Sequence, residues 1–172
     1  MTSRNDRRAE ELAERLHSMA PELLTFFRRR TSDPEDAADL LAECFLVAWR
    51  RRRQVPGDSR EALMWMYGVA SNVLRTQRRA TRRQGALLER LRATYSESHA
   101  PAELPEVTDA IARLPGDQAE LVRLVHWDGF SVVEAATILE LSESTARGRY
   151  QRARIRLSED PSIRELNRAS GR

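Results

Sequence analysis

The amino-acid sequence predicts an all-α protein of two small helical domains joined by a linker, with a helix-turn-helix in the C-terminal domain. Apolar residues recur at spacings of three and four through most of the chain, which is the period of an amphipathic helix. The sequence has no run of alternating β-branched residues flanked by hairpin turns. A polar stretch with nearby prolines interrupts the helical pattern. We therefore expect domains over residues 1–80 and 107–160, a linker over 81–106 and a C-terminal tail over 161–172.

The composition is compatible with nucleic-acid binding. All 29 basic residues are arginine, the net charge is +3 and 32% of the residues are charged. Arginine presents a planar fork of donors that suits phosphate and guanine. A GC-rich genome encodes the same preference for arginine, so this observation alone does not assign a function.

Neither an enzyme nor a membrane protein is indicated by the motifs. The single cysteine, Cys44, excludes an internal disulfide and a cysteine-based zinc site, and the three histidines have no common spacing. No phosphate-cradling loop or nucleophile motif is present, so we expect no catalytic residue, no metal and no other cofactor. No apolar run approaches the ~20 residues that span a bilayer. We expect a cytoplasmic protein without membrane insertion.

Three helices are predicted in the first domain. The first has a single apolar face, which Pro21 is expected to kink or interrupt, and the face comprises Leu12, Leu16, Met19, Leu23 and Phe26. The second begins at residues 32–35, where a capping side chain, a proline and acids coincide, and its buried stripe comprises Ala37, Leu41, Cys44, Phe45 and Ala48. The third spans about residues 61–79 after a loop of residues 54–60, and its inward side chains are Trp65, Met66, Val69, Ala70 and Val73.

The second domain ends in a predicted helix-turn-helix. Amphipathic helices over residues 107–114 and 118–127 precede it. Ser131 and Glu134 have the spacing of a capping box, and Ser142 is placed to cap a further helix after a short break. Two helices joined by a tight turn, with small alanines where they cross, form the arrangement that inserts its second helix into a DNA major groove.

The second helix of this arrangement, which we call the reading helix, has one face suited to DNA. Its inward residues are expected to be Ala146, Tyr150, Ala153 and Leu157. Arg147 can fork onto guanine and Gln151 onto adenine, each pair contributing about 1–3 kcal/mol of base discrimination. Gly148 would let the backbone approach DNA closely. The candidate DNA-binding residues are Ser144, Arg147, Gly148, Arg149, Gln151 and Arg152. A simpler interpretation is a charged, solvated helix at the end of a bundle.

These residues resemble region 4 of extracytoplasmic-function (ECF) sigma factors, which binds the promoter element near minus 35. The resemblance depends on the motifs at residues 114–115, 127–131, 134–136, 142–145 and 152–154. Glu140 stands where the family usually has glycine, so we expect a turn without a left-handed residue.

The first domain is similar to region 2 of the same family through residues 33–37, 39–45 and 48–49. The resemblance implies that the second helix docks on the clamp helices of the polymerase β′ subunit. The acidic residues of positions 33–43 have no basic residue among them, which suits a partner with a basic surface. The implied polymerase-binding residues are Asp36, Asp39, Leu40 and Glu43.

The third helix is similar to the part of region 2 that captures the melted minus 10 element. The resemblance assigns residues 54–60 to holding a flipped base and Asn72 to the non-template strand. Extruded bases need a pocket, and single strands need stacking surfaces and positive charge. The candidate minus 10 residues are Asn72, Trp65, Arg75, Arg78 and Arg79. Trp65 is as consistent with the core as with stacking, whereas Trp49 and Trp127 are expected in the core.

Both modules in this order indicate an RNA polymerase sigma factor. The implied partners are core polymerase, through the β′ clamp helices and the β flap, together with promoter DNA and an anti-sigma factor. One alternative is a helix-turn-helix regulator that acts without replacing sigma and has an N-terminal dimerisation or sensor bundle. Another is a sigma-mimicking protein that only binds an anti-sigma factor.

Overall fold

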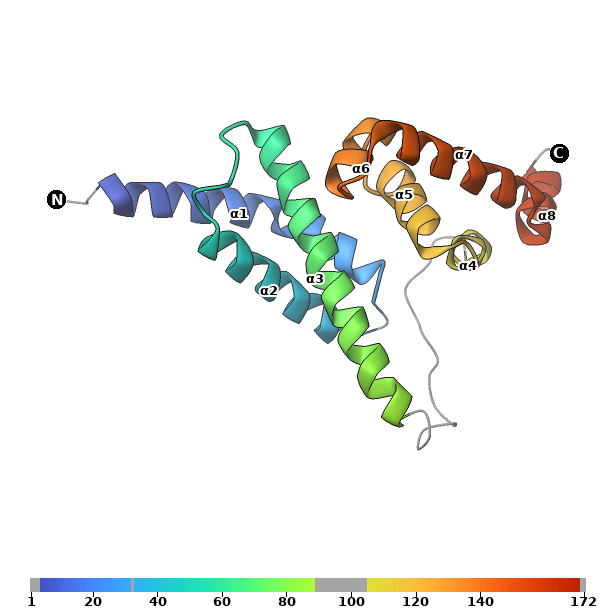
Figure 1. The fold of residues 1–172 in the computed structure, drawn as a ribbon, viewed down its shortest axis with the longest axis horizontal. Helices are drawn as coiled ribbons and strands as arrows, with labels where there is room; N and C mark the ends of the chain where they lie inside the picture. The colour runs from blue at the N-terminus through green and yellow to red at the C-terminus, as the bar shows by residue number, and fades with distance from the viewer. Residues whose placement is uncertain (1–3, 32, 89–104, 171–172) are drawn as a thin grey trace. The chain divides into compact units, whose positions relative to one another are not determined.

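The structure is a computed structural model that describes residues 4–31, 33–88 and 105–170. These residues form eight helices and contain no strand, which confirms the all-α prediction (Figure 1). The chain divides into two compact units, residues 1–100 and 101–172. None of the described helices is long and apolar enough to cross a membrane.

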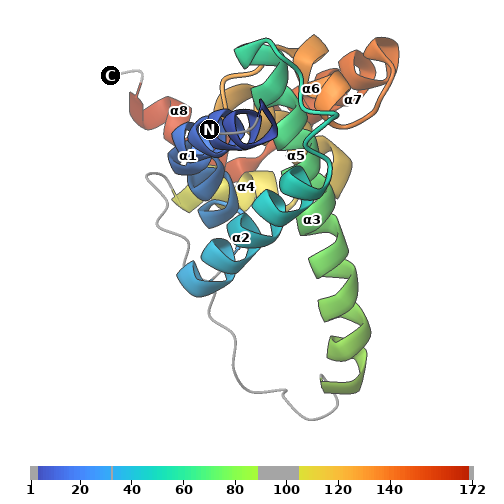
Figure 2. The ribbon, with the colours of Figure 1, turned by 90° about the vertical axis from the view of Figure 1, so that its left-hand side faces the viewer.

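The first unit consists of α1 (Arg4–Arg28), α2 (Pro34–Arg50) and α3 (Ser59–Leu88), and α2 packs against both α1 and α3 (Figures 1 and 2). The start of α2 is fixed locally, as predicted. The Asp33 carboxylate accepts a hydrogen bond of 2.8 Å from the Glu35 backbone N–H, and Pro34 occupies the first turn.

The core of the first unit is apolar and includes the aromatic rings of Phe26, Phe27 and Tyr67. All five residues of the expected α1 face are buried. The ring of Phe26 meets those of Phe27 and Tyr67 edge to face, with centroids 5.2 and 5.3 Å apart. Burying each large apolar side chain contributes about 1.5–3 kcal/mol. The side chains with no exposed surface include Leu23, Phe26, Phe27, Cys44 and Met66.

Several expectations for the first unit differ from the structure. Pro21 lies inside α1 and does not interrupt it, so of the two expected effects the interruption is wrong. The buried stripe of α2 includes Leu40, with Leu41 half-buried, and Trp49 is 41% exposed instead of lying in the core. Helix α3 continues to Leu88, so residues 81–88 of the expected linker are helical. The remainder of that linker up to residue 104 lies outside the described residues.

The second unit consists of α4 (Pro105–Ala112), α5 (Gly116–His126), α6 (Val132–Ile138), α7 (Glu143–Glu159) and α8 (Pro161–Ser170). Its core includes a cluster of buried residues from α4, α5, α7 and the short connection between α4 and α5. Four half-buried side chains pack against this cluster: Val107, Trp127, Tyr150 and Leu157. The buried members of that cluster are Ile111, Leu114, Ala119, Val122 and Ala153.

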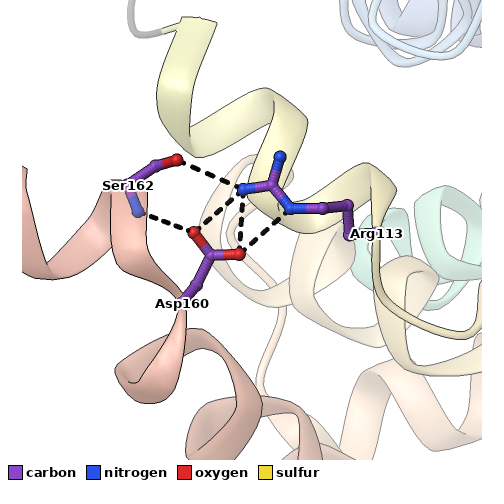
Figure 3. Close-up of polar contacts among 3 residues, drawn as sticks. All are labelled: Arg113, Asp160 and Ser162. Carbon is purple, nitrogen blue, oxygen red and sulfur yellow. Dashed lines mark hydrogen bonds and ion pairs between the residues drawn. The ribbon is translucent and has the colours of Figure 1, made fainter.

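Helix α8, which falls within the expected C-terminal tail of residues 161–172, packs as part of this unit. It packs against α4 and α7. Figure 3 shows the joint: Arg113 donates to both carboxylate oxygens of Asp160 at 2.8–3.1 Å, and the Ser162 backbone N–H donates to Asp160 at 3.0 Å. The hydrogen bond from the Arg113 side chain is the main reason that the pKa of the Asp160 carboxyl is lower than its usual 3.8, and the backbone bond from Ser162 lowers it further.

Candidate nucleic-acid interface

Local capping bonds position the two helices of the helix-turn-helix. The Glu134 N–H donates to Ser131 Oγ at 3.2 Å, and the Ser131 N–H donates to Glu134 Oε2 at 2.8 Å, which confirms the capping box of α6. The Thr145 N–H donates to Ser142 Oγ at 3.2 Å and caps α7. Both helix starts are therefore determined by residues within one turn of them.

The turn between α6 and α7 contradicts the expectation for Glu140. This residue has φ 56°, so a left-handed residue is present although it is not glycine. The Glu140 N–H donates to Thr137 O at 3.2 Å, and the Leu141 N–H donates to Ala136 O at 2.9 Å. These two bonds are those of a Schellman motif, which requires the left-handed residue to satisfy the last carbonyls of α6. Glu140 therefore adopts a strained backbone conformation, and this conformation ends α6 sharply.

The outward face of α7 matches the prediction at Ser144, Arg147 and Gln151 but not at Gly148, which was expected to be exposed and is half-buried. Ala146 and Ala153 have no exposed surface, and Tyr150 and Leu157 are half-buried on the same inward side. The residues expected to reach base edges, Ser144, Arg147 and Gln151, are all exposed. Gly148 is half-buried, and a Cβ built there would lie 3.6 Å from Arg152 Nη1, an ordinary contact. The unit itself therefore does not require glycine at this position.

Acids from within the unit reach two of the predicted DNA-binding arginines. Arg147 lies 3.4 Å from Glu143 one turn earlier on α7, and Arg149 lies 3.1 Å from Asp117 at the start of α5. Arg152 makes no ion pair with any described residue. An ion pair between exposed side chains is worth about 0–1 kcal/mol, so phosphate can replace either acid at small cost.

The candidate minus 10 residues lie on α3. Asn72, Arg75 and Arg79 are exposed, and Arg75 donates to the side-chain oxygen of Asn72. Trp65 is half-buried, which leaves part of its ring accessible. Arg78 is engaged within the unit, because its Nη2 donates to the Arg30 carbonyl at 3.3 Å.

Helix α1 holds the loop of residues 54–60, an interaction that the sequence did not reveal. Arg15 Nη2 donates to the Pro56 carbonyl oxygen at 2.8 Å across 41 residues. At the end of the loop, Asp58 Oδ1 accepts a bond of 2.9 Å from the Glu61 N–H in the first turn of α3. The path of the loop is therefore tied to two helices, and no local pattern predicted the contact with Arg15.

The candidate polymerase surface on α2 differs from the predicted set in one residue. Asp36, Asp39 and Glu43 are exposed, but Leu40 is only 4% exposed and faces the core. Leu46, which was not among the predicted residues, is 55% exposed. Residues 39, 43 and 46 are spaced by four and three, so they share one face of α2. The acidic face therefore has an apolar residue, and that residue is Leu46 instead of Leu40.

Two family models match the chain: Sigma-70 region 2 over residues 16–84 and Sigma-70, region 4 over residues 104–157. The ECF RNA polymerase sigma factor SigM of Mycobacterium tuberculosis is 30% identical over 154 residues, which covers 89% of this chain and 77% of SigM. SigL of the same organism is 26% identical over 131 residues, covering 73% and 74%. The sigma factor RpoE of Bartonella quintana, solved in complex with the anti-sigma factor NepR, aligns with TM-score 0.68 and 26% identity over 87% of this chain and 96% of that chain.

The two matched regions occur in the order that the sequence motifs predicted, one in each helical unit. Their presence defines a protein of the sigma-70 class. The chain belongs to its ECF sigma factors, the subunits that direct RNA polymerase to promoters.

Proposed function

We propose that the second unit recognises the minus 35 element through Ser144, Arg147 and Gln151, and that the first unit binds core polymerase and the opened minus 10 strand. The observation that carries this proposal is the two-sided character of α7. Its inward alanines have no exposed surface, whereas these three polar residues are exposed on the opposite side. A helix held in this way can enter a major groove with its polar side chains free to reach base edges.

The direct test is initiation in vitro by sigma-free core polymerase to which the chain is added. The Arg147→Ala variant should lower initiation at promoters that depend on the minus 35 element by about 5- to 150-fold, because one bidentate contact to guanine supplies roughly 1–3 kcal/mol. Affinity for core polymerase should stay unchanged. Arg168→Ala, at an exposed residue of α8, is the control. Equal activity of the two variants would refute the assignment of the reading face.

The polymerase-binding surface in this proposal consists of Asp39, Glu43 and Leu46 on α2. Two acids beside an exposed leucine suit a partner with basic side chains and an apolar pocket. Replacing Asp39 and Glu43 by arginine should weaken core association at least tenfold. Replacing Glu10 and Glu11 on α1, which are also exposed, makes the same change in charge and should have little effect. Equal weakening by both double variants would mean that net charge, and not this surface, governs association.

The opened strand is assigned to the loop of residues 54–60 together with Trp65, Asn72, Arg75 and Arg79. Arg75 and Arg79 supply exposed positive charge, and the half-buried Trp65 offers part of an aromatic ring for stacking. The Asn72→Ala variant should reduce permanganate reactivity of thymines in the minus 10 element of the initiation complex. Gln77→Ala, also exposed on α3, should not. Unchanged reactivity in both variants would remove Asn72 from the site.

We further propose regulation by an anti-sigma factor, because the related RpoE was solved in complex with NepR. When the chain is purified from its native cell, we expect it to copurify with a protein that blocks its binding to core polymerase. Recovery of all of the chain in a fully active form, without such a protein, would contradict this proposal.

A further inference from the structure

An acid of α5 neutralises one arginine of α7. Arg149 Nε lies 3.1 Å from Asp117 Oδ2, and Asp117 stands in the first turn of α5. The helix itself supplies no such charge, because residues 147–156 include arginines but no acid. Arg149 is among the residues predicted from the sequence to contact DNA, so its ion pair with another helix needs an explanation.

Two consecutive residues at the start of α5 each hold an arginine of α7. Asp117 holds Arg149, and Gln118 Oε1 accepts a hydrogen bond of 2.6 Å from Arg156 Nη1. Positions 149 and 156 are two helical turns apart, so the two arginines share one flank of α7. That flank faces the start of α5. Gln118 fixes Arg156 without neutralising it, whereas Asp117 cancels the charge of Arg149.

The ion pair is not what docks α7 on α5. The two helices pack against each other in the second unit (Figure 1), and the side chains of Asp117 and Arg149 are 46% and 30% exposed. An ion pair this exposed changes an equilibrium by only about twofold to fivefold. The contact therefore matters more for the charge of this flank than for its packing. The buried residues that join the two helices include Ala119, Val122 and Ala153.

The Asp117 carboxylate is held in position to bind a guanidinium. Its Oδ1 accepts a hydrogen bond of 3.0 Å from the Gln118 N–H, while its Oδ2 lies against Arg149. The partial positive charge at the start of α5 also stabilises the carboxylate. The carboxylate offers Arg149 the kind of charged oxygen acceptor that a DNA phosphate offers.

A released Arg149 would lie beside the part of α7 that is free to meet DNA. Arg152 follows Arg149 by one turn on the same side of the helix. It is exposed and makes no ion pair with any described residue. Side chains that reach phosphates strengthen binding to every sequence, whereas contacts to base edges strengthen binding only to the correct one. The pairing of Arg149 with Asp117 therefore withholds a contact that would not depend on sequence.

We propose that Asp117 acts as an intramolecular substitute for phosphate, which holds Arg149 away from DNA and limits the sequence-independent affinity of the second unit for duplex DNA. Weaker binding to phosphates lowers the occupancy of incorrect sites, of which a genome offers a large excess. The proposal rests on the proposed function, because it requires α7 to be the helix that meets DNA.

The test measures binding of the full-length chain alone to two fluorescein-labelled duplexes of unrelated sequence, by anisotropy over a salt series of about 50 to 200 mM. Asp117→Asn removes the charge but keeps an acceptor for the Gln118 N–H. Its affinity for both duplexes should rise about threefold or more at the lowest salt, because a broken ion pair no longer opposes binding. The slope of log K against log salt should steepen by about 0.9, the value for one phosphate of a duplex.

Three further variants isolate the role of Arg149. Asp117→Ala, which offers Arg149 no acceptor, should show the same gain as Asp117→Asn. Asp109→Asn removes the same charge from an exposed residue of α4 and should leave the salt slope unchanged. Asp117→Asn added to Arg149→Gln should also leave the slope of that background unchanged, because no arginine is released. Circular dichroism checks that each variant keeps its helices.

Four results would overturn the proposal. They are no gain in either Asp117 variant, an equal gain in Asp109→Asn, a gain that persists in the Arg149→Gln background, or a gain on only one of the two duplexes. The last result would mean that Arg149 reads bases. If wild-type binding is too weak to measure, a measurable complex of Asp117→Asn is the expected gain.

The initiation assay of Arg147→Ala separates this proposal from the proposed function. If Arg147→Ala lowers initiation but neither Asp117 variant binds duplex DNA more tightly, then only the role of Asp117 is wrong. If none of these variants has an effect, the assignment of α7 to the promoter fails as well.

Discussion

Replacing Glu140 by glycine is expected to stabilise the second unit, because Glu140 is left-handed at φ 56° in the turn of the helix-turn-helix. A left-handed conformation costs a residue with a Cβ about 1–2 kcal/mol. Glycine removes that cost but loses about 0.4–1 kcal/mol through the greater freedom of the unfolded chain. The Glu140 side chain is exposed and has no partner among the described residues, so no contact is lost. The net gain should be about 0.5–1 kcal/mol.

Hydrogen exchange of the full-length chain, read by mass spectrometry, follows each unit separately. Amides of α6 and α7 that exchange by unfolding of the unit should exchange about twofold to fivefold more slowly in Glu140→Gly. Glu140→Ala is the matched control: it removes the same carboxylate but keeps a Cβ, so its exchange should stay close to that of the wild type. Gly129→Ala tests the opposite change. Gly129 has φ 74° and open space around a built Cβ, so alanine should speed exchange through backbone strain alone.

The reasoning is refuted if Glu140→Gly exchanges no more slowly than Glu140→Ala. That result would mean that the Schellman turn imposes no strain on a residue with a side chain. Peptides of the first unit serve as an internal reference and should be unchanged in all three variants.

Three further predictions concern single groups. Ser131→Ala should destabilise α6 by about 1 kcal/mol, because it removes the hydroxyl of the capping box, and the same exchange measurement should show faster exchange in α6. The Ser162 amide resonance should titrate below pH 3.8, because it follows the lowered pKa of Asp160. The ion pair between Asp160 and Arg113 is fully formed above about pH 3.8 and is lost as the pH falls through the lowered pKa. The Asp160→Asn variant should show no such titration. Burial, and secondarily the charge of Glu43, raises the pKa of the Cys44 thiol to about 12, so a thiol reagent at neutral pH should label Cys44 only after the first unit unfolds in urea.

Features specified within one helical turn were predictable from the sequence. The capping box at Ser131, the cap at Ser142 and the start of α2 follow from residues no more than three positions apart. The inward alanines of α7 follow from helical periodicity combined with the small size that helix crossing requires. These local rules located the helix-turn-helix and its outward face.

Helical periodicity left the rotation of α2 undetermined. Leu40 and Leu41 both continue the row of Ala37, Cys44 and Ala48 at spacings of three and four, and the two leucines lie about 100° apart around the helix, on opposite edges of that row. Packing against α1 and α3 determines which side of α2 faces the core. It buries Leu40, leaves Leu41 half-buried, and leaves Leu46 and Trp49 exposed. The acidic residues chosen from the sequence are therefore exposed on α2, whereas periodicity did not identify which of its apolar residues are exposed.

The sequence by itself determined the class of the protein, the order of its two modules and the polar face of α7, because each depends on residues close together along the chain. Only the tertiary structure decided which charges are neutralised. Residues 147–156 contain no acid, yet Asp117 of α5 pairs with Arg149 at 3.1 Å, and Asp160 and Arg113 join α8 to α4 across 47 residues. Coulomb energy depends on distance in space, and the distance between segments far apart in sequence is set by the packing of the helices that carry them.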